Sequence, residues 1–199
     1  NGRSIAKVEE WDHEGNGTEV TLGNGVRVIS DFDDYGRPKK VSVKKGGSVV
    51  TREEFEYNRS GKIKTIKALQ GSGTYKVDET RKFSYDSVGR LISSNIKSTG
   101  YVKKYHIRKE YSFDLNDNLV SVRHVGKKTD TSYGFKPGTS QIWAIRGEGA
   151  GAGIAYTYDA SGNVTGKYNN NKNTTFTYKG GRLTEINGPN GKTTLGRTR

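Results

Sequence analysis

The chain has 199 residues and a formal net charge of +13, with 27 Gly, 3 Pro and neither Cys nor Met. The absence of Cys excludes disulfides, thiolate metal sites and cysteine nucleophiles from this sequence. No apolar run approaches the roughly 18 residues of a membrane helix, so we expect no membrane span. Because the first residue is Asn and Met is missing, we expect an internal fragment or a processed product.

Along the chain, one five-residue pattern recurs: an aromatic residue, Asp or Asn, two further residues, and Gly. It is complete at residues 11–15, 32–36, 57–61, 85–89 and 158–162, and degenerate at 113–117, 135–138 and 178–181. The Asp side chain can accept hydrogen bonds from backbone amides ahead of it, and Gly can take a positive φ. The pattern therefore predicts a β-turn, and its recurrence predicts a repeat protein. The residues that we assign to this turn and fold motif are Trp11, Asp12, Gly15, Phe32, Asp33, Gly36, Tyr57, Gly61, Tyr85, Asp86, Gly89, Arg90, Phe113, Asp114, Tyr158, Asp159, Gly162 and Tyr178.

The segments around these turns read as strands. Residues 26–29, 62–67 and 174–178 alternate polar with apolar or aromatic residues and are rich in β-formers. An apolar residue stands six places after several of the aromatic anchors, namely Ile63, Leu91, Leu119 and Val164. We therefore predict an all-β fold with almost no helix, in which antiparallel hairpins form a curved, spiralling or solenoid-like sheet. We expect a single domain over residues 1–199, with about eight degenerate hairpins anchored near residues 11, 32, 57, 85, 113, 135, 158 and 178.

Residues 146–154 differ in kind, because Gly alternates strictly with other residues there. If this stretch is a strand, one of its faces carries no side chains, so another backbone or a flat ligand could approach closely. The other interpretation is a flexible Gly-rich loop. Both stay open from the sequence.

The repeat resembles the YD repeats of Rhs proteins, Tc-toxin cocoon subunits and teneurins. Residues 85–91 match the pattern Tyr-Asp-x-x-Gly-Arg-Leu at every defined position, and residues 158–164 carry Asn163 and Val164 in place of Arg and Leu. The resemblance implies a β-shell, often one that encloses a toxic C-terminal domain. It implies as partners the remainder of a larger YD-repeat chain or an encapsulated toxin domain, and a secreted or cell-surface location. No match to the Asp-Pro-rich cleavage motif of the bacterial members occurs here, and eight repeats give only about sixteen short strands, too few to close a large cocoon. We therefore expect part of a wall, or a small open variant, with a structural role.

The chemical alternatives have weaker support. His13, His106 and His124 lack metal-ligand spacing, and residues 31–36 and 114–118 only superficially resemble calcium loops. The repeated Asp occupies the same slot in every unit, which a turn requires and an active site does not. We predict no enzyme activity, no cofactor and no metal site.

The basic excess allows a second function. Lys and Arg occur as doublets, and several Tyr lie near them, so the Tyr- and Lys-rich sheet face is a candidate binding surface for a glycan, a nucleic acid or another anionic polymer. The candidate binding residues are Tyr101, Lys103, Lys104 and Tyr105.

Overall fold

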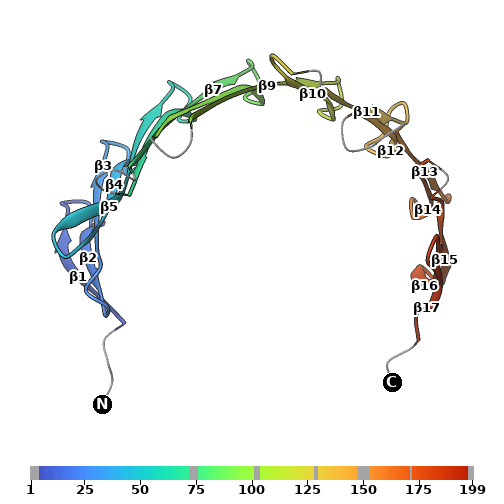
Figure 1. Cartoon of the computed structure of the whole chain (residues 1–199), viewed down its shortest axis with the longest axis horizontal. Coiled ribbons are helices and arrows are strands. Elements are labelled where there is room, and N and C mark those ends of the chain that lie inside the picture. The colour runs from blue at the N-terminus through green and yellow to red at the C-terminus, as the bar shows by residue number, and fades with distance from the viewer. Residues whose placement is uncertain are drawn as a thin grey trace. The chain divides into compact units, whose positions relative to one another are not determined.

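The computed structural model describes residues 5–71, 76–100, 104–127, 130–147, 153–170 and 172–196. Seventeen strands belong to one antiparallel sheet, and these ranges contain no helix. Figure 1 shows the strands following one another in chain order, from β1 in blue to β17 in red. The prediction of an all-β fold of antiparallel hairpins is confirmed.

The chain divides into two compact units, Asn1–Arg108 and Lys109–Arg199. The first contains β1 (Ala6–Trp11), β2 (Gly17–Leu22), β3 (Arg27–Phe32), β4 (Pro38–Lys45), β5 (Ser48–Tyr57), β6 (Ile63–Gln70), β7 (Val77–Tyr85) and β8 (Leu91–Thr99). Strand β9 spans Lys104–Phe113. The second contains β10 (Leu119–His124), β11 (Thr131–Phe135), β12 (Ile142–Arg146), β13 (Ile154–Tyr158), β14 (Val164–Tyr168), β15 (Thr174–Lys179), β16 (Arg182–Gly188) and β17 (Gly191–Thr194). The single domain predicted from the sequence stays a prediction.

The register at the turns follows the sequence spacing. Tyr85 pairs with Leu91 across its turn, and Tyr57 pairs with Ile63 in the same way. Each of these pairs adjoins a register shift, which accommodates the extra residue of the turn. The apolar residue six places after the anchor is therefore the anchor's cross-strand partner, as the spacing predicts.

The two faces of the sheet differ in chemistry in the first unit. Directly paired residues share a face, so the ladders of β5 to β8 place Phe55, Ile66, Phe83 and Tyr85 on one side, which we call the aromatic face. The alternate residues form the charged face, which includes Glu56, Lys67, Lys82 and Lys97.

Little of this sheet is covered. Among the described residues, the only buried apolar side chains are those of Ala68 and Ala144. Stability must therefore come largely from backbone ladders and from side-chain pairs between neighbouring strands.

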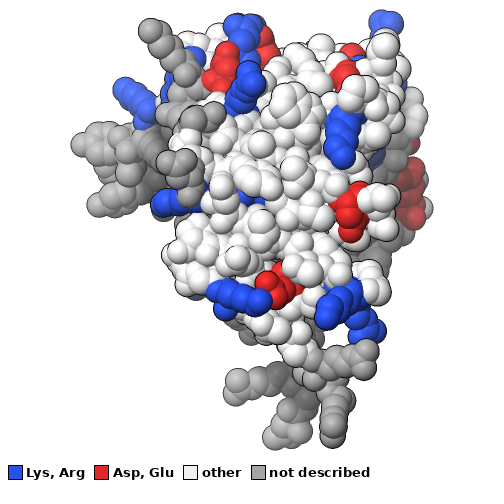
Figure 2. All heavy atoms as spheres, turned by 90° about the vertical axis from the view of Figure 1, so that its right-hand side faces the viewer, with Lys and Arg blue, Asp and Glu red and all other residues white. Residues whose placement is uncertain are grey.

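On the face drawn in Figure 2, charged side chains lie scattered among uncharged ones, several in pairs of opposite sign.

Within the described ranges, no helix has the length and apolar character needed to cross a bilayer.

Candidate functional site

The turn that follows each aromatic anchor is the most regular feature of the chain, and residues 85–90 form its clearest copy. The Oδ1 atom of Asp86 accepts the backbone N–H of Val88 at 3.1 Å and that of Arg90 at 2.8 Å. The backbone N–H of Gly89 donates to the carbonyl of Asp86 at 3.1 Å. Gly89 has a φ of +90°, which side-chain-bearing residues rarely adopt. Asp and Gly are thus both required by the backbone of the turn.

The other turns repeat this arrangement. The Oδ1 atom accepts two backbone N–H groups in five further copies, at Asp12, Asp33, Asn58, Asp114 and Asp159. A positive φ is found at Gly15, Gly36, Gly61 and Gly162.

The degenerate copies also close as turns. Asp117 replaces Gly and takes a φ of +63°, a conformation that Asp tolerates better than most residues. In the copy that begins at Phe135, the N–H of Lys136 donates to the carbonyl of Gln141, so this turn is one residue longer. After Tyr178, Gly180 and Gly181 both have positive φ, as a two-residue type I′ hairpin requires.

Four residues after the Asp lies a hydrogen-bonding partner, which was assigned to the turn motif from the sequence only at Arg90. Arg90 Nε donates to Asp86 Oδ2 at 2.7 Å, and Arg37 Nε donates to Asp33 Oδ2 at 2.8 Å. Asn replaces Arg in three other turns, where its Nδ2 donates to Oδ2 over 2.8–2.9 Å: Asn16, Asn118 and Asn163. The sequence signal for this partner was the recurrence of Arg or Asn four residues after the Asp.

These contacts perturb the carboxyl groups of the turns. The hydrogen bond from Arg37 is the largest influence on Asp33 and lowers its pKa. Burial is the largest single influence on Asp86 and acts to raise its pKa, but the hydrogen bonds and charge of Arg90 outweigh burial and lower it. Both carboxylates are therefore held in their charged form.

Three tyrosine anchors connect their turns to the preceding ones. Tyr85 donates its hydroxyl to the carbonyl of Ile63 at 2.8 Å, and Tyr57 donates to the carbonyl of Pro38 at 2.7 Å. Tyr158 donates to the carbonyl of Ile142 at 2.6 Å. Each acceptor is the first residue of the strand that leaves the preceding turn, and we call these three bonds the hydroxyl links.

Cations of one turn lie over the aromatic ring of the next. The Arg37 guanidinium is 4.2 Å from the centroid of the Tyr57 ring, and Lys62 Nζ is 5.7 Å from that of Tyr85. The glycine leaves room for this arrangement, because a Cβ on Gly89 would lie 2.6 Å from Lys62 Cε. Neighbouring turns therefore interlock through hydrogen bonds and ring contacts, which supply about 0.5–1 kcal/mol per exposed cation–ring pair.

A second polar group, which sequence reasoning missed, crosses the aromatic face of the first unit. Arg81 Nη1 lies 3.6 Å from Glu53 Oε1, and Arg81 Nε donates to Glu79. Tyr105 donates its hydroxyl to the same Glu79 carboxylate, and this bond is the largest of the influences that raise the pKa of Tyr105. This polar group joins the strands β5, β7 and β9, which are far apart in sequence.

Two of the four candidate binding residues, Lys104 and Tyr105, lie within the described part of the chain. Tyr101 and Lys103 lie outside the described residues. Lys104 and Tyr105 are consecutive on β9, so they point to opposite faces of the sheet. A platform that combines tyrosine rings with lysines is not assembled by these two residues. The Gly-rich stretch also lies largely outside the described residues, between the end of β12 and the start of β13.

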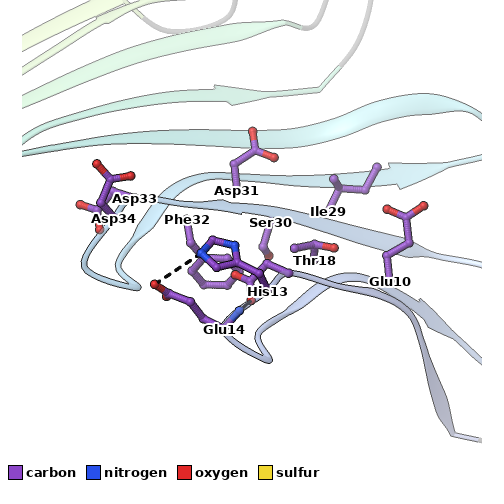
Figure 3. Close-up of a pocket in the computed structure, with 11 residues that line it drawn as sticks. Glu10, His13, Glu14, Thr18, Ile29, Ser30, Asp31, Phe32, Asp33 and Asp34 are labelled. Carbon is purple, nitrogen blue, oxygen red and sulfur yellow. Dashed lines mark hydrogen bonds and ion pairs between the residues drawn. The ribbon is translucent and has the colours of Figure 1, made fainter.

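A cavity of about 510 Å³ lies beside the first two turns. Figure 3 shows Glu10, Asp31, Asp33 and Asp34 around it. His13 Nε2 lies 3.9 Å from Glu14 Oε1. Asp33 already accepts hydrogen bonds within its own turn. In the part of the chain that the structure describes, no three His, Asp or Glu side chains form a group that could hold a metal. His106 is exposed on β9, with Nε2 2.7 Å from Asn95 Oδ1.

Interlocked turns on a single antiparallel sheet define a tandem β-hairpin repeat protein. Comparison with protein-family models agrees, because the model described as Teneurin YD-shell matches residues 5–137. The chain belongs to the teneurin YD-shell family. The RHS repeat model matches residues 158–193, so the resemblance to YD and Rhs repeats is confirmed.

Among solved structures, the chain is similar to one in the crystal structure of TcdB2-TccC3-Cdc42, with 14% identity and a TM-score of 0.48 over 88% of this chain. It is also similar to TcdB2-TccC3 without its hypervariable C-terminal region, with 14% identity and a TM-score of 0.47 over 89% of this chain. In each case it spans 12% of the length of the solved chain. No curated protein matches the sequence significantly.

Proposed function

We propose that this chain is a wall segment of a β-shell that scaffolds or encapsulates a toxin or effector domain. The observation that carries the proposal is the uncovered aromatic face. Rings and aliphatic side chains, interrupted by the ion-paired group of Glu53, Glu79 and Arg81, line one side of the sheet in the first unit, and almost none of them is buried within the described residues. A sheet of this kind gains stability when a further surface shields that face from water.

Its partners are then the remainder of a larger YD-repeat chain and the enclosed domain, and its location is outside the cell or on its surface. The role is structural, because the repeated Asp and Gly close the turns and Tyr57, Tyr85 and Tyr158 link neighbouring ones. Family membership supports this proposal, since the family model describes a shell.

Protease protection in the native, full-length gene product tests the proposal. We expect a domain adjoining the repeats to resist digestion in the intact protein and to become sensitive when Gly89→Val and Gly61→Val loosen the wall. Ser87→Ala serves as the matched control. If the adjoining domain is digested equally fast in the intact protein, the Gly61→Val/Gly89→Val double variant and the Ser87→Ala control, encapsulation is refuted.

A further inference from the structure

A basic strip crosses the charged face of β6 to β9 in the first unit. It consists of Lys67, Lys82, Lys97 and Lys104, and all four side chains are exposed. Lys64, at the register shift of β6, is also exposed and lines the same groove as Lys67 and Lys82. The strand register places Lys67, Lys82 and Lys97 on this face. Asn95, the cross-strand partner of Lys82, contacts His106 on β9, so His106 lies on the same face. Lys104 is two residues from His106 on the same strand and therefore also points to this face.

The register sets the spacing of the positive charges. Lys67 pairs with Thr80, which places Lys82 on the diagonal of the next strand. Lys82 pairs with Asn95, which places Lys97 on the following diagonal. Diagonal neighbours lie about 7–8 Å apart in an antiparallel sheet. The strip therefore presents about one positive charge per strand in a zigzag across the sheet.

Hydrogen-bonding groups lie between these charges. A groove of about 490 Å³ contains Lys64, Lys67 and Lys82 in its lining together with the hydroxyls of Thr65, Thr80 and Ser84. Hydroxyl and amide groups both donate and accept hydrogen bonds. The groove thus combines cations with groups suited to a polar, oxygen-rich ligand.

Three carboxylates of β5 to β8 share this face with the strip. Glu56 Oε1 lies 3.4 Å from Lys67 Nζ and lines the groove, so that lysine is paired. Glu54, directly opposite Lys67, forms an ion pair with Arg52, and Asp78 forms one with Lys76. Within the described ranges, no ion pair joins Lys64, Lys82 or Lys97 to a carboxylate. The pKa of Glu56 is lowered, first by its hydrogen bond from Thr65 and then by Lys67, with a contribution from the charge of Lys64.

Phe83 is the one aromatic residue in the lining of this groove, which contains no Tyr or Trp. The strand register puts Phe83, Tyr85 and Tyr105 on the aromatic face, and the described residues of β5 to β9 place no Phe, Tyr or Trp on the charged face. Single-stranded nucleic acids depend on aromatic side chains for base stacking. A ligand that is charged at regular intervals and rich in hydroxyls does not need them.

We propose that the basic strip is a binding site for a linear sulfated polysaccharide. Its sulfate groups contact Lys67, Lys82 and Lys97, and its hydroxyls exchange hydrogen bonds with the Thr, Ser and Asn side chains between them. The lysines also steer the anionic chain toward the sheet at low salt.

Binding of a fluorescent heparin octasaccharide to the 199-residue chain tests this inference, with fluorescence anisotropy measured across a salt titration. We expect the triple variant Lys67→Gln/Lys82→Gln/Lys97→Gln to lose about tenfold in affinity at low salt, since each exposed charge pair contributes a few-fold. Its affinity should also depend less steeply on salt, because fewer screened contacts remain.

A matched control removes three exposed cations of β1, β3 and β4 in the first unit, Lys7→Gln, Arg27→Gln and Lys45→Gln, with the same change in net charge. We expect this control to bind within about twofold of the parent, because these strands lie outside the strip and exposed charges are screened by salt. Circular dichroism confirms that both variants keep their strands. Equal losses in the two triple variants, or no binding by the parent chain, would overturn the site. Equal binding of chemically desulfated heparin, or tighter binding of an oligonucleotide of the same length, would overturn the assigned ligand.

Discussion

Replacing Gly89 by Val tests whether the turn and its contact with the preceding turn stabilise the repeat. The φ of +90° at Gly89 is unfavourable for a β-branched residue, at a cost of about 1–3 kcal/mol. The new Cβ would also lie 2.6 Å from Lys62 Cε and displace this side chain from the Tyr85 ring, which removes about 0.5 kcal/mol more. We expect Gly89→Val to lower the free energy of unfolding by about 2–3 kcal/mol.

Two other variants separate the two contributions. Gly15 has a φ of +85°, and a Cβ placed there has no neighbour within 4 Å, so Gly15→Val reports the backbone cost alone. Ser87→Ala changes an exposed position of the same turn as Gly89 and should stay within about 0.5 kcal/mol of the parent. Equilibrium unfolding in urea gives the free energies.

Because repeat proteins can unfold in parts, hydrogen exchange on β7 and β8 should accompany the urea curves and show the loss of stability locally. If Gly89→Val and Ser87→Ala have the same midpoint in urea, the turn requires no glycine and the reasoning is refuted. If Gly89→Val and Gly15→Val lower the free energy of unfolding equally, the backbone conformation accounts for the whole loss and the contact with Lys62 contributes nothing.

Three further predictions concern single contacts. Tyr85→Phe removes the bond to the Ile63 carbonyl and should cost about 0.5–1.5 kcal/mol in urea unfolding, whereas an unchanged midpoint would exclude a role for the hydroxyl links. The pKa values of Asp33 and Asp86 are lowered in the folded state. Their contribution to the free energy of unfolding is therefore complete above the ordinary Asp pKa of about 3.9 and is lost as the pH falls through the lowered values. Thermal melts between pH 7 and pH 2 should show this loss of stability, and the double variant Asp33→Asn/Asp86→Asn should show a smaller one. Asp117→Gly should raise the free energy of unfolding by up to about 1 kcal/mol, because Gly accepts the φ of +63° without strain, and a lower midpoint would contradict this.

The turn chemistry was readable from the sequence because each of its requirements is local. Asp86 bonds amides two and four residues ahead, and Gly89 supplies a backbone angle, so a five-residue pattern is sufficient to find them. The register at Tyr85 and Leu91 followed for the same reason, since the length of the turn fixes which residues face each other.

Contacts between repeats were not readable in this way. The bond from the Tyr85 hydroxyl to the Ile63 carbonyl joins residues 22 positions apart, and no sequence pattern states which carbonyl a tyrosine reaches. The group of Glu79, Arg81 and Tyr105 depends on the alignment of β7 with β9 in the folded sheet. Alternation along β9 could have shown in advance that Lys104 and Tyr105 point to opposite faces, because a period of two separates any consecutive pair.

The hydroxyl links all run from one hairpin to the hairpin before it in the chain. During synthesis the N-terminal hairpins emerge first, so a carbonyl such as that of Ile63 stays without its tyrosine partner until the next anchor, Tyr85, has been made. The hairpins anchored by Tyr57, Tyr85 and Tyr158 thus each carry the group that completes the preceding hairpin. A wall built in this way grows in one direction, and whole hairpins can be added on the C-terminal side during evolution without altering the turns already present.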